Sequence, residues 1–411
     1  MRRGSIFSRK SRMHLLFLSF LSVLFFLLPG KALASEGNTP GLEEDAGETF
    51  SYEEVQELAE EPDTSLIEEL DFSEVQDTID EILGGEFRFE NTVLDLITGR
   101  QPFTLESFLE AVVRQAKEGW QTEKRILLSI LVLGIAASLF SNFTLIFKNQ
   151  QIAQVSFEIT YMLLFLILLQ VFTGAQELAE GVIVSLRQFM NALIPAWCLA
   201  VTMASGAATA VVFYQFLLGL IYVLEWLIQE GLLGLIEVYV ILVFINHLTK
   251  EEYLSQLTEL VGKAAGWILK TMLAAVIGFN TIQGIVTPVV DSLKHTALSR
   301  VARMLPGIGN VAGSVTDVLL GSAVLIKNGV GAAALIVIAL LCLAPLLKLG
   351  LLALILELAA ALIQPVSDKR MTGCAAGMGR AVRLLFQAVF TVAVFFVITI
   401  VVVTVSVRGS I

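Results

Sequence analysis

The sequence predicts an all-α fold: a polytopic α-helical membrane protein with a small exported helical N-terminal region. Of its 411 residues, 56% are hydrophobic and 16% are charged, and the mean hydropathy is +0.78, whereas soluble domains are ~25% charged. Long apolar windows fill most of the chain, and an export signal precedes them. These observations exclude an ordinary soluble globular protein.

The first 34 residues have the layout of a cleavable secretory signal. Basic residues occupy the beginning, an apolar run follows at 15–28, and Ala32-Leu33-Ala34 offers a cleavage site. The apolar run is shorter than the ~20 residues that cross a bilayer. We therefore expect a signal peptide at 1–34 rather than an uncleaved signal anchor.

An acidic segment follows at 35–62. Between Ser35 and Glu90 the chain has twenty acidic residues and one basic residue, Arg88. Such a charge balance excludes nucleic acid and anionic headgroups as partners of this segment, and it is typical of solvated, disordered chain.

Two amphipathic helices are expected in the exported region 63–125. The first carries apolar residues at mostly helical spacing and ends at Gly84-Gly85. The second has its apolar stripe at i, i+3, i+4 and i+7 after Thr104, a suitable N-cap. Two short helices bury little by themselves, so they should dock on the membrane domain or on a partner. The candidate partner interface is Leu105, Phe108, Leu109 and Val112.

The membrane domain is expected at 126–411. Eight windows are apolar enough to cross a bilayer: 126–147, 155–174, 207–228, 232–248, 264–287, 329–347, 349–365 and 384–407.

A ninth stretch, 187–206, contains Arg187 and Pro195 and could span or form a re-entrant hairpin. The positive-inside rule favours the hairpin, which places loops 288–328 and 366–383 in the cytoplasm and 249–263 outside.

The second polar stretch, 300–322, contains Pro306, Gly307 and Gly309. Each of the two polar stretches precedes three predicted spans. This pattern favours an inverted repeat with broken helices, as in many transporters.

Ionisable residues inside spans are candidate functional residues, because burying a charge in lipid is costly. Glu237 and Lys270 could pair across neighbouring helices, either structurally or for transport. Asp317, Lys327 and Glu357 could line a polar cavity, or they could belong to helices that rest at the interface with their charges in water.

Enzyme chemistry finds little support. The chain has three histidines, and it lacks the H-E-x-x-H, G-x-S-x-G and P-loop patterns. The three cysteines form no C-x-x-C pair, which argues against a thiolate metal site. The glycines of 306–313 miss the dinucleotide spacing, so these glycines and those at 373–377 indicate close helix packing. We expect no catalytic residue, cofactor or metal.

Two stretches resemble the stage III sporulation protein AE family of endospore-forming bacteria. They are Arg303-Met-Leu-Pro-Gly-Ile-Gly-Asn-Val-Ala-Gly-Ser-Val-Thr-Asp317 with its continuation 321–331, and Leu354-Ile-Leu-Glu-Leu-Ala-Ala-Ala-Leu-Ile-Gln-Pro365. The layout is also similar, including Leu193-Ile-Pro195 followed by Ala204-Ser-Gly206. The likeness extends from about Leu83 to the C-terminus.

This resemblance implies a non-enzymatic subunit of a channel-like, secretion-like complex between mother cell and forespore, required for late forespore gene expression. It implies the mother-cell membrane around the forespore as the location. The implied partners are an operon-encoded ATPase and other membrane and exported subunits. The alternative from the residues is an autonomous secondary transporter that uses Glu237, Lys270 and Asp317, and a membrane-bound enzyme is a more remote third class.

Overall fold

The structure is a computed structural model, and all its regular elements in the described residues are helices. Those residues are 67, 70–85, 87–99, 113–114, 117, 124–132, 134–136, 150–205, 215, 218–219, 221–223, 226–248, 251, 253–275, 277–278 and 309–406. Within them, four helices are long and apolar enough to cross a membrane: Phe157–Ala204, Ile221–Leu248, Gly321–Ile363 and Lys369–Thr404. The all-α membrane fold is thus confirmed. The predicted signal peptide and the acidic segment lie outside the described residues.

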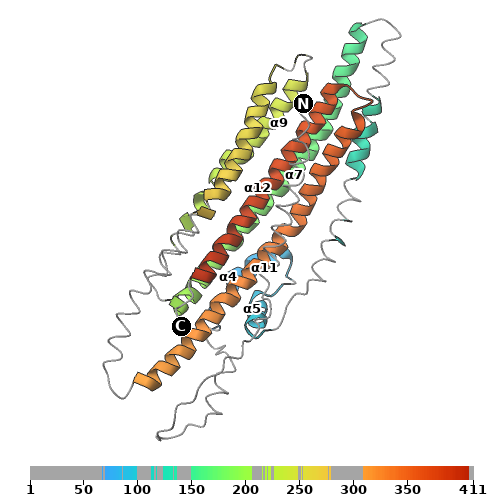
Figure 1. The fold of residues 1–411 in the computed structure, drawn as a ribbon. Helices are drawn as coiled ribbons and strands as arrows, with labels where there is room; N and C mark the ends of the chain where they lie inside the picture. Colours follow the sequence, from blue (N-terminus) through green and yellow to red (C-terminus); the bar gives the residue numbers. More distant parts are fainter. Residues whose placement is uncertain are drawn as a thin grey trace, which may run out of the picture. The chain divides into compact units, whose positions relative to one another are not determined.

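Three long helices lie side by side: α7 (Gln150–Ser205), α11 (Gly309–Ile363) and α12 (Lys369–Ser406). Helix α11 packs on both others, and α12 also packs on α7 (Figure 1). The core lies between them, because their facing side chains are almost all apolar and buried. The other face of α12 contacts α9 (Gly234–Leu248), which continues the π-helix η1 (Trp226–Leu233). A further helical stretch occupies 255–275.

Two pairs of segments that the sequence predicted to be separate are each one continuous helix in the structure. The predicted span 155–174 and the predicted hairpin 187–206 are parts of α7, and the windows 329–347 and 349–365 are parts of α11. The re-entrant hairpin is therefore wrong for 187–205. Each helix contains a proline, Pro195 or Pro345. A proline removes one backbone hydrogen bond, which packed neighbours in a bundle compensate, so the helix continues.

The continuous α11 also overturns the predicted topology. Residues 309–328 and 366–383 lie at opposite ends of this helix, so a helix that crosses the membrane cannot leave both in the cytoplasm. The guanidinium of Arg370 reaches the carbonyl of Leu248 at 3.5 Å. The start of the 249–263 loop and residue 370 therefore lie at the same end of the bundle, where the prediction put them on opposite sides.

The matched broken segments of the predicted inverted repeat are helical where the structure describes them. Residues 187–205 lie inside α7, and 309–322 form the beginning of α11. Pro306 and Gly307 lie outside the described residues.

Two short helices pack against the long ones: α4 (Ser73–Leu83) and α5 (Phe89–Ile97). Helix α4 ends at Gly84, whose φ of 83° is in the left-handed region that glycine adopts most readily. This end is the one that the sequence predicted. The side-chain amide of Gln76 joins the two helices by donating to the carbonyl of Phe87 at 2.8 Å and accepting from the amide of Phe89 at 2.9 Å.

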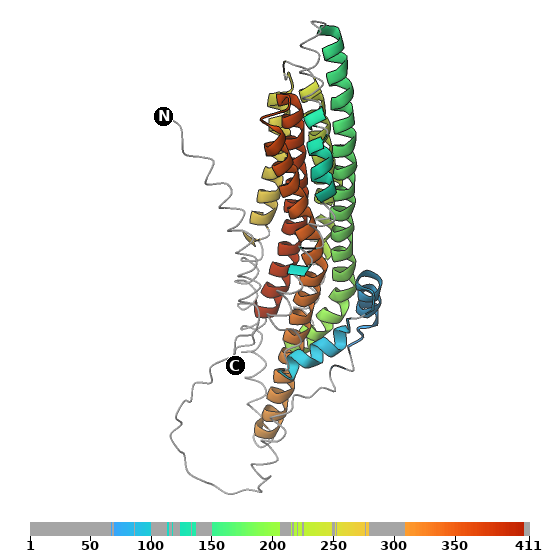
Figure 2. The ribbon, with the colours of Figure 1, turned by 90° about the vertical axis from the view of Figure 1, so that its right-hand side faces the viewer.

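Helices α4 and α5 dock on the long helices (Figure 2). The ring of Phe89 lies 6.5 Å from that of Phe189 in α7. Helix α5 approaches α11 so closely that a Cβ atom at Gly329 would lie 2.7 Å from Cγ1 of Ile97. Docking on the membrane domain, one of the two predicted outcomes, thus holds for α4, the first predicted helix. Helix α5 was not predicted from the sequence. Leu105, Phe108, Leu109 and Val112 lie outside the described residues, so their interface stays a prediction.

Candidate functional site: polar contacts between the long helices

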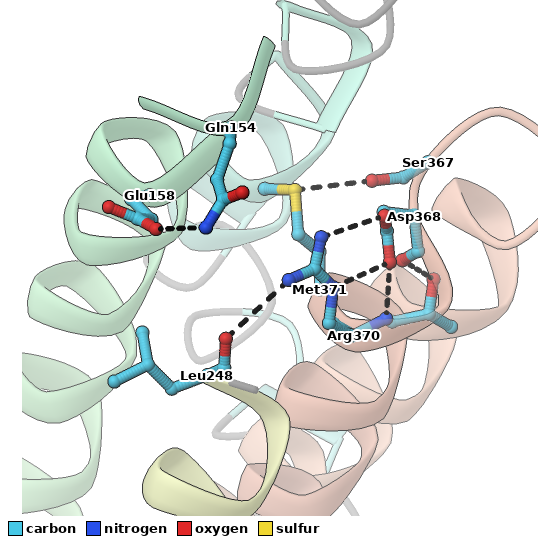
Figure 3. Close-up of polar contacts among 8 residues, drawn as sticks. Gln154, Glu158, Leu248, Ser367, Asp368, Arg370 and Met371 are labelled. Carbon is cyan, nitrogen blue, oxygen red and sulfur yellow. Dashed lines mark hydrogen bonds and ion pairs between the residues drawn. The ribbon is translucent and has the colours of Figure 1, made fainter. Parts of the chain in front are cut away.

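Arg370, in the first turn of α12, contacts the end of α9 (Figure 3) and also α7. Its guanidinium donates to the carbonyl of Leu248 at the C-terminus of α9, and its Cζ lies 3.4 Å from the ring centroid of Phe157 in α7. A cation is favoured at both places, since the end of a helix carries partial negative charge and an aromatic face attracts cations. Asp368 holds the arginine by accepting from its Nε and Nη2 at 3.3 Å each. We call these four residues the Arg370 junction.

A buried aromatic cluster adjoins this junction between α7 and α9. The Tyr161 hydroxyl donates to the carbonyl of Phe244 at 2.8 Å, and the two rings are stacked with centroids 5.4 Å apart. The ring of Phe165 also stacks on Phe244. The hydrogen bond satisfies the one polar atom of a fully buried tyrosine, so the cluster fixes α7 against α9.

Glycines of α12 allow α9 to approach closely. A Cβ atom at Gly373 would lie 2.3 Å from Nε2 of His247, and one at Gly377 would lie 2.4 Å from Cγ1 of Val243. Neither distance is compatible with a real side chain. The prediction that the glycines of 373–377 serve close helix packing is therefore confirmed.

Glu357 is ion-paired with Arg383 between α11 and α12. Their side chains are 31% and 33% exposed, so the pair is at the edge of the helix interface. A Cβ atom at Gly379 would lie 3.1 Å from Cγ of Glu357, which shows how closely the two helices approach here. The predicted cavity residue Glu357 thus joins helices.

Glu237 does not pair with Lys270 in the structure. Its carboxylate accepts a hydrogen bond from the side-chain amide of Gln176, which joins α9 to α7. Lys270 is exposed on the 255–275 helix. The predicted ion pair is wrong, because Gln176 occupies the position beside the carboxylate.

Lys327 is fully buried in α11. Its ammonium donates to the carbonyl of Thr404 in the last turn of α12 at 2.9 Å. A Cβ atom at Gly331, one turn further on, would lie 2.5 Å from Oγ1 of Thr404. The cation therefore caps the negative end of α12 at an interface with no room for solvent. This placement excludes the alternative of a lysine that rests in water.

The other candidates have different surroundings. Arg187 is half-buried and Pro195 is exposed in α7, while Gly309 and Asp317 belong to the beginning of α11. Within the described parts of the chain, no group of three or more His, Cys, Asp or Glu is arranged to hold a metal ion. The described polar contacts connect helices, which is an architectural role.

Two residues that make polar contacts between elements were not identified from the sequence. Arg370 was used only as a marker of topology, and Asn246 was not considered, although its buried side chain accepts from the amide of Leu254 at 2.9 Å. An available signal was Asp368, a helix-capping residue type directly before a basic pair.

Comparisons with known proteins identify a family. The family model described as stage III sporulation protein AE matches residues 87–407. Stage III sporulation protein AE of Bacillus subtilis (strain 168) is 25% identical over 315 residues, which cover 76% of this chain and 79% of that protein. No solved structure matches. Because the match extends over most of the chain, this protein belongs to the stage III sporulation protein AE family.

Proposed function

We propose that this protein is a non-enzymatic, multi-pass subunit of a channel-like, secretion-like complex that connects the mother cell with the forespore. The observation that carries the proposal is the family match over residues 87–407, in a chain with four helices apolar enough to cross a membrane in its described part. The protein would reside in the mother-cell membrane around the forespore and would be required for late forespore gene expression.

The polar contacts support a subunit that is built to hold a fixed arrangement. Glu237, Glu357 and Lys327 are each bonded to a neighbouring long helix. The alternative of an autonomous transporter was motivated by Glu237, Lys270, Asp317 and the inverted repeat. Glu237 is hydrogen-bonded to Gln176 and Lys270 is exposed, while residues 187–205 and 309–322 are helical rather than broken. These observations favour the subunit over the transporter.

The proposed partners are an operon-encoded ATPase and further membrane and exported subunits. The test uses a strain of the source organism that lacks the gene, complemented with the affinity-tagged full chain. We expect the tagged chain to restore spore yield and a late forespore reporter, and to co-purify with the ATPase and other operon products.

A matched control separates assembly from folding. Phe108→Asp changes the predicted partner interface, whereas Arg114→Asp introduces the same carboxylate at an exposed helical position nearby. We expect the first variant to reach the membrane but lose co-purification and spore yield, and the second to retain both. Full complementation without any co-purifying operon product, together with solute movement by the purified chain in liposomes, would favour the transporter instead.

A further inference from the structure

The outward face of α7 changes character along the helix. Exposed side chains form a stripe, in which they recur every three or four residues from 155 to 181 and again from 188 to 199. In the first part of the helix the exposed side chains are mainly apolar, 36% to 59% exposed: Val155, Ile159, Met162, Leu163, Leu166 and Leu169. Among the exposed polar residues there, Gln154 and Glu158 are hydrogen-bonded to each other at 3.2 Å. Beyond it the exposed side chains are mainly polar, including Thr173, Glu177, Glu180, Gln188 and Asn191, and the apolar exception is Leu199 near the end of the helix, which is 49% exposed. An apolar outward face suits lipid, and a polar one suits water.

The neighbouring helices show apolar outward faces at the level of the first part of α7. Helix α9 is at this level because Tyr161 bonds to Phe244, and α12 is there because Gly373 approaches His247. Exposed apolar side chains here include Ile241 and Ile245 of α9 and Leu358 and Leu362 of α11. The exposed acids Glu158 and Glu259 are bonded here, to Gln154 and Lys263, and Glu237 bonds to Gln176 just beyond the apolar part of the stripe.

The far half of the bundle has the opposite arrangement. In α11 between 329 and 347, and in α12 between 384 and 404, no residue is classed as exposed. These are the most apolar parts of the two helices, and they face the interior. Helices α4 and α5 cover this half, with contacts at Phe189 and Gly329 and with exposed charges such as Glu74 and Glu90. Where the structure describes it, this half has a mainly polar exterior over an apolar interior, which is the pattern of a bundle in water.

Length leads to the same division. Helix α7 has 56 residues, about 84 Å at the usual rise, whereas the hydrocarbon core of a bilayer is about 30 Å thick. The part from Gln150 to Phe172 is about 34 Å long and includes the whole apolar part of the stripe. The remaining residues 173–205 extend about 50 Å further.

We propose that the bilayer surrounds the half of the bundle that contains Val155 to Leu169, and that residues 173–205 of α7 stand in water beyond it. The far halves of α11 and α12 are then the interior of a helical stalk on the side of α4 and α5. The stalk holds α4 and α5 away from the membrane surface. In that position they could contact exported subunits of the proposed complex.

The test measures which medium touches each part of the α7 stripe. Single cysteines replace Leu166 and Gln188 in the full chain after Cys198, Cys342 and Cys374 are changed to alanine. The purified protein in lipid nanodiscs is labelled with nitroxide. Both positions are exposed in the structure, so collision rates report the medium rather than burial. We expect the label at 166 to collide mainly with oxygen and the label at 188 mainly with a water-soluble nickel complex.

A second measurement keeps the native cysteines. Leu166→Asp should reduce the carbonate-resistant, membrane-inserted fraction several-fold, whereas Gln188→Asp should leave it unchanged. A label at 188 that prefers oxygen, or equal loss of insertion in the two aspartate variants, would overturn the proposal. A water-accessible label at 166 would overturn it as well.

Discussion

Replacing Gly377 by alanine tests the close packing of α12 on α9. The new Cβ atom would lie 2.4 Å from Cγ1 of Val243, against 3.4–4 Å for an ordinary contact. The helices must therefore separate by about 1 Å, and overpacking of this kind typically costs about 1–3 kcal/mol. Both methyl groups of Val243 obstruct the new atom, since Cγ2 would lie at 3.0 Å.

The matched control is Gly181→Ala in α7, where a Cβ atom would meet nothing within 4 Å. Both substitutions gain the same helix propensity, so their difference isolates the clash. We expect the free energy of unfolding of Gly377→Ala to fall about 1–3 kcal/mol below that of Gly181→Ala. Reversible unfolding of the purified chain by SDS in mixed micelles, followed by circular dichroism, measures this difference.

A compensating change tests the mechanism. Val243→Ala removes the obstructing methyl groups, so the double variant with Gly377→Ala should be more stable than the sum of the single effects, with a coupling of about 0.5–3 kcal/mol. Equal stability of Gly377→Ala and Gly181→Ala, or strict additivity with Val243→Ala, would refute the packing argument.

Three further predictions concern polar contacts. Glu357→Gln and Arg383→Gln should each destabilise the bundle, and the double variant should recover part of the loss with a coupling of about 0.5–3 kcal/mol in the same SDS assay; additive losses would contradict the pair. Lys327→Met should speed hydrogen exchange in the last turn of α12 while the first turn stays unchanged, because the cap of that end is lost; unchanged exchange would exclude the capping role. The hydroxyl and amide of Ser73 hold the pKa of Asp71 below its ordinary value, so this contact stabilises the start of α4 above pH ~3.9 and is lost as pH falls through the folded-state pKa. Ser73→Ala should raise that pKa in a carboxyl NMR titration, and an unmoved titration would refute the assignment.

The sequence was sufficient for the helical class and for the end of α4. Apolar composition and window length predict membrane helices directly, and Gly84 supplies the left-handed conformation that ends α4. Hydropathy did not predict correctly whether a proline or a charged residue between two apolar windows ends the helix. Pro345 and Lys348 look like a boundary between two spans, yet both lie inside α11. One charge or one proline is an insufficient reason to leave a helix when packing satisfies the backbone.

The site was harder to predict because its contacts are tertiary. Arg370 and Leu248 are 122 residues apart, and no local pattern connects an arginine to a main-chain carbonyl at that distance. The sequence does not show which helices are neighbours. Lys270 was therefore the expected partner of Glu237, because it carries the opposite charge and Gln176 carries none. The small residues at 373–377 were predictable, since close helix approach requires a row of residues without bulky side chains.

The Arg370 junction also has a mechanical meaning. It fastens α7, α9 and α12 together near one end, and Gln176 with Glu237 joins α7 to α9 further along. Such a joint is a fulcrum, and a rod pivoting on it magnifies small rotations. From Phe157 to the end of α7 is about 72 Å, so a tilt of about 5° at the junction moves that end by about 6 Å. A small change of angle at the junction is therefore a displacement of several ångströms at the opposite end of α7.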